Sequence, residues 1–351
     1  MKNRRAAVAA LSTAALAGLL LSGCGDDDPT ASGGDGLTVA AAFYPLAFVT
    51  QQVAGDHATV ENLTQAGGEP HDLELTGRQV GQISDADLVV YLAGFQPSVD
   101  EAVEQNAEDR AVDVADLVEL LDDPEDEHGD EHVEDEHAGE DEHAGEDEHA
   151  GEDEPAEDEH TDEHAEDEDH EGHDHGDLEG DPHIWLDPTN LEPIAAAVAD
   201  RLAEADPDHA DDYHANADAL SADLEALDGE FESGLAHCTQ RVIVVAHEAF
   251  GYLAHRYDLE QVGISGIDPE AEPSPERLSE VHDVVEAEGV TTIFYERLVS
   301  PDVAETLAND LGVEAAVLDP IEGLTDDTAD QDYFDLMRAN LEALRTANGC
   351  S

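Results

Sequence analysis

Three histidines stand in distinctive local sequences and could bind one metal ion together. His71 follows Glu-Pro in the segment 68–72, His183 lies in Asp-Pro-His-Ile-Trp-Leu-Asp-Pro at 181–188, and His247 follows the apolar run Val-Val-Ala. Neutral imidazole is a good ligand for Zn2+, and three imidazoles with one oxygen donor complete a tetrahedron. Each histidine alone could also be a structural or surface residue. Their separations match no metallopeptidase motif, so spacing does not show that they converge.

The elements that must position these histidines form an alternating pattern of strands and helices. This pattern is typical of parallel sheets, and ligands collect where such strands end. We expect strands at 37–43, 59–63, 87–92, 111–114, 241–246, 261–263, 291–295 and 314–318. We expect helices at 47–53, 98–105, 190–204, 207–235, 247–257, 276–288, 302–311 and 332–346. The helix at 207–235 is long, with apolar residues at helical spacing. The fold class is therefore α/β, with two lobes joined by one long helix.

The first 24 residues have the features of an export signal. Lys2 and two arginines precede an apolar stretch at 6–21, which is too short for a comfortable membrane span. The stretch ends in Leu-Ser-Gly-Cys24, which resembles the lipobox of bacterial lipoproteins. Lipid on Cys24 would anchor an extracytoplasmic protein to the membrane, with residues 25–36 as a flexible tether. The alternative is an ordinary signal peptide with an incidental cysteine.

Residues 122–181 differ from the rest of the chain because Asp, Glu and His dominate them. Such a segment buries too little apolar surface to offset the entropy of ordering, so we expect a disordered insertion. Its imidazole and carboxylate groups would bind several ions weakly and could concentrate zinc or sense its excess; a solvated spacer is the alternative. The histidines of this auxiliary weak metal loop are His128, His132, His137, His143, His149, His160, His164, His170, His173 and His175.

Charge and cysteines narrow the class of protein further. The formal net charge is -78, from 12 basic and 90 acidic residues. Such a surface repels nucleic acid, so no nucleic-acid partner is expected. Beyond Cys24 the chain has Cys238 and Cys350. An even pair in an oxidising compartment favours a disulfide over free thiols, with metal ligation as the minor alternative.

The segments around the histidines resemble the metal-binding receptors of bacterial zinc and manganese ABC importers, most closely the zinc branch. The resemblance covers nearly all of 37–351 in the same order. It includes Phe-Tyr-Pro-Leu at 43–46, Glu-Pro-His-Asp at 69–72, Ala-Asp-Leu-Val-Val at 86–90, 181–188, 247–252, Thr-Ile-Phe-Tyr-Glu at 292–296 and Val-Leu-Asp-Pro-Ile-Glu at 317–322. It implies two Rossmann-like lobes, 37–205 and 239–351, joined by a rigid helix at 206–238, with the metal in the cleft between them.

Carried over by position, the resemblance makes His71 and His183 ligands from the first lobe and His247 a ligand from the second. Glu322 is the favoured fourth ligand, Asp319 the alternate and Glu296 a third choice with a more structural role; water is a further possibility. Relatives also carry a disulfide in the second lobe.

The function implied is an extracytoplasmic receptor that delivers Zn2+ to an ABC permease with its ATPase. The protein would be a membrane-anchored monomer and not an enzyme. Three imidazoles favour zinc over manganese, whose sites have more oxygen ligands, but a manganese receptor remains the alternative within the family. A secreted zinc hydrolase would need an open coordination position and a general base, and no His-Glu-x-x-His motif occurs. A metal-storing or adhesin surface lipoprotein is the other alternative.

Overall fold

The computed structural model describes residues 36–122, 178 and 180–351. Gly36–Ser351 is one unit by its internal contacts. Cys24, the leader, the tether as far as residue 35 and every histidine of the weak metal loop lie outside the described residues. Within the described ranges, none of the helices combines the length and apolar character that a membrane span requires.

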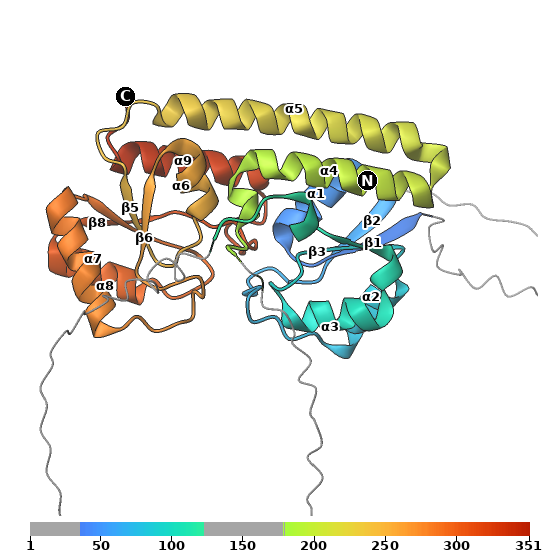
Figure 1. Ribbon diagram of the computed structural model, residues 1–351, viewed down its shortest axis with the longest axis horizontal. Helices are drawn as coiled ribbons and strands as arrows, with labels where there is room; N and C mark the ends of the chain where they lie inside the picture. Colours follow the sequence, from blue (N-terminus) through green and yellow to red (C-terminus); the bar gives the residue numbers. More distant parts are fainter. Residues whose placement is uncertain (1–35, 123–177, 179) are drawn as a thin grey trace, which may run out of the picture. The chain divides into compact units, whose positions relative to one another are not determined.

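The first lobe is built on a four-stranded parallel sheet with the order β2-β1-β3-β4. Helices α1 and α4 pack on each other over one face, and α2 and α3 pack together on the opposite side (Figure 1). The elements are β1 (Leu37–Ala41), α1 (Tyr44–Ala54), β2 (Ala58–Asn62), α2 (Gly77–Asp85), β3 (Leu88–Tyr91), α3 (Pro97–Asn106), η1 (Glu108–Arg110), β4 (Ala111–Asp113), η2 (Ala115–Leu117), η4 (Ile184–Leu186), η5 (Pro188–Asn190) and α4 (Leu191–Ala205).

The second lobe repeats this design with the strand order β6-β5-β7-β8, again parallel. Its elements are β5 (Val242–Val245), α6 (Gly251–Tyr257), β6 (Glu260–Gly263), α7 (Pro275–Glu288), β7 (Thr292–Tyr295), α8 (Asp302–Leu311), β8 (Glu314–Val317) and α9 (Tyr333–Ala347). The two parallel sheets agree with the expected fold of two Rossmann-like lobes. Most strand ends lie within two residues of their predicted positions.

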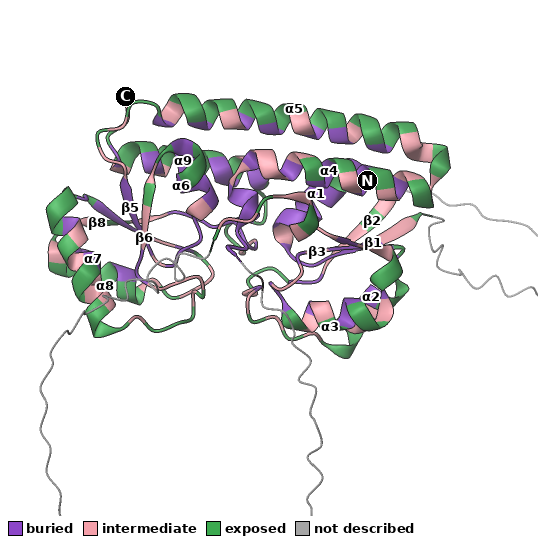
Figure 2. Cartoon of the chain, viewed as in Figure 1, coloured by how far each residue is buried: buried purple, intermediate pink, exposed green. Residues whose placement is uncertain are grey.

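The apolar residues of strand β5 are buried on both faces of the sheet. Val242 and Val244 pack into a core with α7 and α8, whereas Ile243 and Val245 join a larger core that continues into the first lobe. Both sets are buried because helices cover both faces of a parallel sheet, so the strand is apolar throughout (Figure 2). The continuous core holds the two sheets against a shared layer of helices.

Helix α5 (Ala210–Leu235), preceded by η6 (Pro207–His209), runs along both lobes (Figure 1). It packs on α1 and α4 of the first lobe and on α6 and α9 of the second. The buried face repeats every three or four residues, as the sequence predicts: Tyr213, Ala217, Leu220, Leu224, Leu227, Phe231 and Leu235. Gly234 allows α9 to approach, because a Cβ there would lie 3.0 Å from Leu341 Cδ1.

Two expectations are wrong in detail. The helix expected from His247 begins only at Gly251, because the backbone before it bonds elsewhere: Glu248 N donates to Gly266 O. Disorder was expected as far as residue 181, but Asp181 belongs to the folded part of the chain. Asp181 is 1% exposed, and its N–H donates to Leu121 O on the other side of the insertion.

Candidate metal centre

Four side chains from different parts of the sequence meet between the lobes. One ligand atom from each of His71, His183, His247 and Glu322 lies within 4.8 Å of the others. Glu322 Oε1 is 3.1 Å from His183 Nε2, 3.4 Å from His247 Nε2 and 3.6 Å from His71 Nε2. The donor set is therefore three imidazole nitrogens and one carboxylate oxygen, which suits Zn2+. The structure thus brings together the histidines and the favoured glutamate singled out from the sequence.

Loops that follow strands position these groups. His71 lies in the loop between β2 and α2, His247 is two residues beyond β5, and Glu322 follows β8. His183 directly precedes η4. The site is therefore at the carboxyl ends of the strands, where parallel sheets place their ligands. Aromatic rings form its wall, with the centroid of Phe95 4.7 Å from that of His71 and the centroid of Trp185 5.4 Å from that of His183.

A constrained turn presents Glu322. Ile321 has φ +60°, which is rare for a β-branched residue and costs free energy unless its surroundings enforce it. Asp319 enforces it, because its Oδ1 accepts a hydrogen bond from Ile321 N at 2.8 Å. Its other oxygen, Oδ2, lies 3.0 Å from Arg297 Nε, and Asn340 bonds its backbone on both sides. Asp319 thus holds the turn, and Glu322 reaches the histidines.

Two buried carboxylates orient the rings. Asp181 Oδ1 lies 2.7 Å from His183 Nδ1, and Glu296 Oε1 lies 2.7 Å from His247 Nδ1. Each carboxylate accepts the Nδ1–H and so leaves the Nε2 lone pair for the centre. Gly251 makes room for Asp181, since a Cβ there would lie 2.4 Å from Asp181 Oδ2. Glu296 thus supports His247 and is not part of the cluster.

The pKa values of His183, His247 and Glu322 differ from those of the same groups in water. Burial opposes protonation of His183 and His247, but the carboxylates beside them outweigh it. They raise the pKa of His183, and the pKa of His247 rises to about 10. Burial alone would raise the pKa of Glu322, yet the three histidine rings hold it well below its usual value. The metal-free cluster therefore holds protons that a cation must displace.

Residues 39–347 match the family model described as "Zinc-uptake complex component A periplasmic" (ZnuA). The chain belongs to the ZnuA family. It is 31% identical over 336 residues to the "High-affinity zinc uptake system protein ZnuA" of Bacillus subtilis, and the match covers 93% of each chain. It is 34% identical over 309 residues to the "Zinc-binding protein AdcA" of Streptococcus pyogenes. That match covers 88% of this chain and only 55% of the relative.

A solved structure supports the ZnuA-family fold. The "Zn(II)-bound ZnuA-like domain" of Streptococcus pneumoniae AdcA aligns with a TM-score of 0.66 and 30% identity, covering 89% of this chain and 99% of that one. The first curated relatives are longer, so this chain spans about 55% of their length. The two-lobed α/β architecture is therefore shared with a zinc-bound domain of AdcA.

Sequence analysis did not single out Glu69 as a ligand or support of this ZnuA-family site, and it also missed the supporting role of Asp181. Glu69 Oε1 accepts a hydrogen bond from His71 N at 3.2 Å, and its carboxyl group lies within hydrogen-bonding reach of Glu322. Burial first, and then the nearby charge of Glu322, raises the pKa of Glu69 to about 9. The sequence feature that could have suggested this role is the position of Glu69 two residues before His71.

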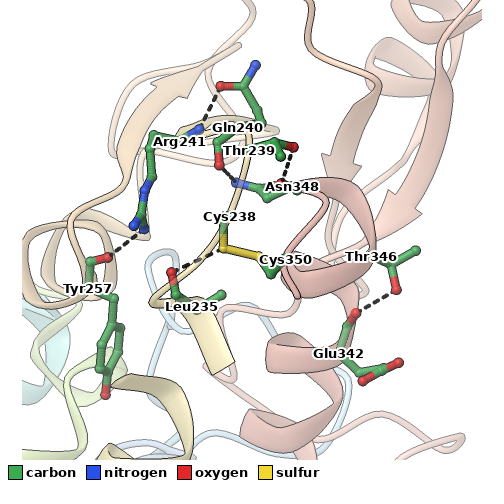
Figure 3. Close-up of a disulfide and its surroundings, with 10 residues drawn as sticks. All are labelled: Leu235, Cys238, Thr239, Gln240, Arg241, Tyr257, Glu342, Thr346, Asn348 and Cys350. Atoms are coloured by element: carbon green, nitrogen blue, oxygen red, sulfur yellow. Dashed lines mark hydrogen bonds between the residues drawn. A yellow bond between two sulfur atoms is a disulfide. The ribbon is translucent and has the colours of Figure 1, made fainter. Parts of the chain in front are cut away.

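The cysteines of the second lobe form a disulfide. Cys238, just beyond α5, is bonded to Cys350 after α9 (Figure 3). Asn348 strengthens the junction, since its O accepts from Thr239 N and its Nδ2 donates to Gln240 O. The bond ties the last helix to the start of the second lobe.

Two other histidines, His57 and His209, lie outside the cluster. His57 and His209 stack with ring centroids 4.0 Å apart. His209 pairs with Asp206, and His57 with Asp212. Trp185 is fully buried, and its Nε1 donates to Pro320 O.

Proposed function

We propose that this chain is an extracytoplasmic zinc receptor that captures Zn2+ at His71, His183, His247 and Glu322 and delivers it to an ABC permease with its ATPase. The observation that carries the proposal is the meeting of three Nε2 atoms around one carboxylate oxygen. Zinc uptake and zinc binding, named in the relatives, support the same metal. A monomer anchored through lipid on Cys24 fits the export signal and the tether.

The chemistry of the donors favours zinc over manganese and binding over catalysis. Manganese sites favour more oxygen ligands than the single carboxylate here. A catalytic zinc site keeps one position open for water or substrate. Here four protein donors would complete a tetrahedron around the ion, and the side chains of three of them are at most 1% exposed. A site of this kind is suited to bind an ion and not to activate a water molecule or a substrate.

Trp185 gives a direct test, because it is the only tryptophan of the chain and its ring lies beside His183. We expect Zn2+ to change its fluorescence with one tight equivalent, and Mn2+ to compete weakly. The variants His71→Ala, His183→Ala and His247→Ala should each lose this equivalent, whereas the exposed control His255→Ala should keep it. Tighter binding of Mn2+ than of Zn2+ would overturn the metal assignment.

The proposal also separates a receptor from a metal store. If residues 123–177 are deleted, a receptor keeps its tight equivalent, because the four donors lie outside that segment. A metal-storing or adhesin lipoprotein that works through its histidine-rich segment would lose nearly all of its zinc binding. Equilibrium dialysis of the deleted chain distinguishes the two.

A further inference from the structure

The segment that carries His183 is bonded to the second lobe, although in sequence it leads into α4 of the first lobe. On one side of His183, the hydroxyl group of Tyr252 in α6 donates a hydrogen bond to Asp181 O at 3.0 Å. On the other side, Trp185 makes two hydrogen bonds to residues of the second lobe. The backbone before and after this ligand is therefore attached to the lobe that supplies two of the other three donors.

Trp185 lies between two points of the second lobe. Its Nε1 donates to Pro320 O, and its carbonyl oxygen accepts a hydrogen bond from Tyr333 OH; each of these bonds is 2.6 Å long. Pro320 lies two residues before Glu322 in the same turn, and Tyr333 is the first residue of α9. This pair of hydrogen bonds, the Trp185 bridge, joins the segment of His183 directly to the turn of Glu322.

Both rings of the Trp185 bridge are fixed by packing. The side chains of Trp185 and Tyr333 are fully buried. The ring of Trp185 meets that of Phe43 edge-on with centroids 5.0 Å apart, and the ring of Tyr333 stacks on that of Phe48 in α1 at 5.4 Å. A buried ring in close contact on several sides keeps one orientation, so its polar atom stays directed at one partner. The bridge therefore sets a fixed distance between the two segments that it joins.

The ligands beside the bridge already have the spacing that zinc requires. Zinc bonds of about 2.0 to 2.2 Å place two ligand atoms of a tetrahedral ion about 3.3 Å apart, and His183 Nε2 lies 3.1 Å from Glu322 Oε1. When both atoms bind zinc, each directs a lone pair at the ion, so they no longer bond to each other and other contacts must hold them. Asp319 fixes the shape of the turn through Ile321 N, but this bond lies within the turn. The bridge supplies the connection between the two ligands.

We propose that Trp185 and Tyr333 are positioning residues of the metal centre, because the Trp185 bridge holds His183 and Glu322 at the spacing of a tetrahedral zinc ion. The inference rests on the proposed function. Ligands that are already held at the right distance lose little freedom on binding. The bridge therefore raises the affinity for zinc and favours four-coordinate binding without contacting the ion.

Tyr333→Phe tests the bridge with the smallest change, because it removes one buried oxygen and keeps the ring that stacks on Phe48. Tyr213→Phe is the matched control, since Tyr213 is equally buried and its hydroxyl group bonds to Asp206, outside the cluster. Competition with a chromophoric chelator measures the zinc Kd of the full chain. We expect Tyr333→Phe to raise this Kd about three- to tenfold, and Tyr213→Phe to leave it within about twofold.

Trp185→Phe breaks the other bond of the bridge. It removes the donor to Pro320 O and keeps an aromatic ring in the same place. We expect the zinc Kd to rise about tenfold. Because both variants break one bridge, the double variant with Tyr333→Phe should bind zinc about as weakly as Trp185→Phe alone. If thermal unfolding shows that Trp185→Phe does not fold, Tyr333→Phe decides by itself.

Co2+ in place of Zn2+ reports on coordination separately from stability. Tetrahedral Co2+ absorbs visible light more strongly than six-coordinate Co2+, so the absorption at saturating Co2+ shows whether all four donors still reach the ion. We expect Tyr333→Phe and Trp185→Phe to lower this absorption. Tyr213→Phe should keep the spectrum of the wild type.

Several outcomes would overturn the positioning role. One is a zinc Kd and a cobalt spectrum of Tyr333→Phe equal to those of the wild type. Another is an equal rise in Kd in Tyr213→Phe, which would indicate only a general loss of stability, and a third is full additivity of the two variants that break the bridge. Failure of the proposed function looks different, because the wild type itself would then show no tight zinc equivalent.

Discussion

Glu322 Oε1, from the second lobe, lies 3.1 Å from His183 Nε2, from the first. The same oxygen is also close to His71 and His247, so one atom is shared by three rings from both lobes. Zn2+ bound here would join the lobes through its own coordination bonds. The affinity for zinc then depends on the loops that carry these groups and not on the cores of the sheets.

The substitution Glu322→Gln should weaken zinc binding by at least about tenfold, because a neutral amide oxygen replaces a carboxylate ligand. Asp319→Asn should change it by less than about threefold, since Asp319 holds the turn through Ile321 N and Arg297. Competition with a chromophoric zinc chelator measures both. The opposite order of effects would make Asp319 the ligand.

The carboxylates behind the rings should matter nearly as much as the ligands. Asp181→Asn and Glu296→Gln each remove the negative charge beside an Nδ1–H, and we expect each to lower zinc affinity about 10- to 100-fold. Asp206→Asn is a matched control, because it alters a carboxylate–imidazole pair outside the site. If Asp181→Asn and Glu296→Gln bound zinc as tightly as the control Asp206→Asn, the two carboxylates would not support the histidine ligands.

Zinc affinity should rise with pH. Protonated His247 must lose its proton to bind the ion, and its pKa is raised from 6.5 to about 10 by Glu296 against the opposing effect of burial. A raised histidine pKa stabilises the metal-free fold fully below pH 6.5, and this contribution is lost as the pH rises toward about 10. Zinc binding near pH 7 should therefore release protons.

Calorimetry in buffers of different ionisation enthalpy measures this proton release. His255→Ala should release as many protons as the wild type, because His255 is exposed and outside the cluster. A zinc affinity that is constant between pH 6.5 and pH 9 would contradict the prediction.

Much of the fold could be predicted from local pattern. Apolar runs in parallel strands and the apolar face of α5 are local patterns in the sequence, and they predicted the order of the strands correctly. Helix α2 (Gly77–Asp85) was not expected. The helix expected at His247 failed for a long-range reason, because Glu248 N bonds to Gly266 O of another loop. Such a bond between residues of two different loops produces no periodic pattern in the sequence.

The site was only partly visible in the sequence. Its ligands come from loops at the ends of different strands, so no spacing showed that they converge, and resemblance to a family supplied the set. Asp181 was missed because composition grouped it with the acidic insertion, although it is buried. Glu69 was missed as a site residue because its importance depends on Glu322, which is distant in sequence.

The disulfide should contribute to stability and not to metal binding. Cys238 and Cys350 are 112 residues apart, and closing a loop of that length stabilises the fold by about 5 kcal/mol in the chain-entropy estimate. The double variant Cys238→Ser, Cys350→Ser should lose a free energy of unfolding of this order in urea. Its zinc affinity should stay within about twofold, because neither cysteine belongs to the cluster.

Thr346→Ala, which removes a hydrogen bond to Glu342 O on the exposed side of α9, is the local control and should cost about 1 kcal/mol or less (Figure 3). A double cysteine variant as stable as this control would show that the bond adds no constraint beyond the packing of α9. A large loss of zinc affinity would instead mean that the end of α9 acts on the centre, since α9 packs against β8, the strand that leads to Glu322. The stability and affinity measurements together therefore separate these two effects.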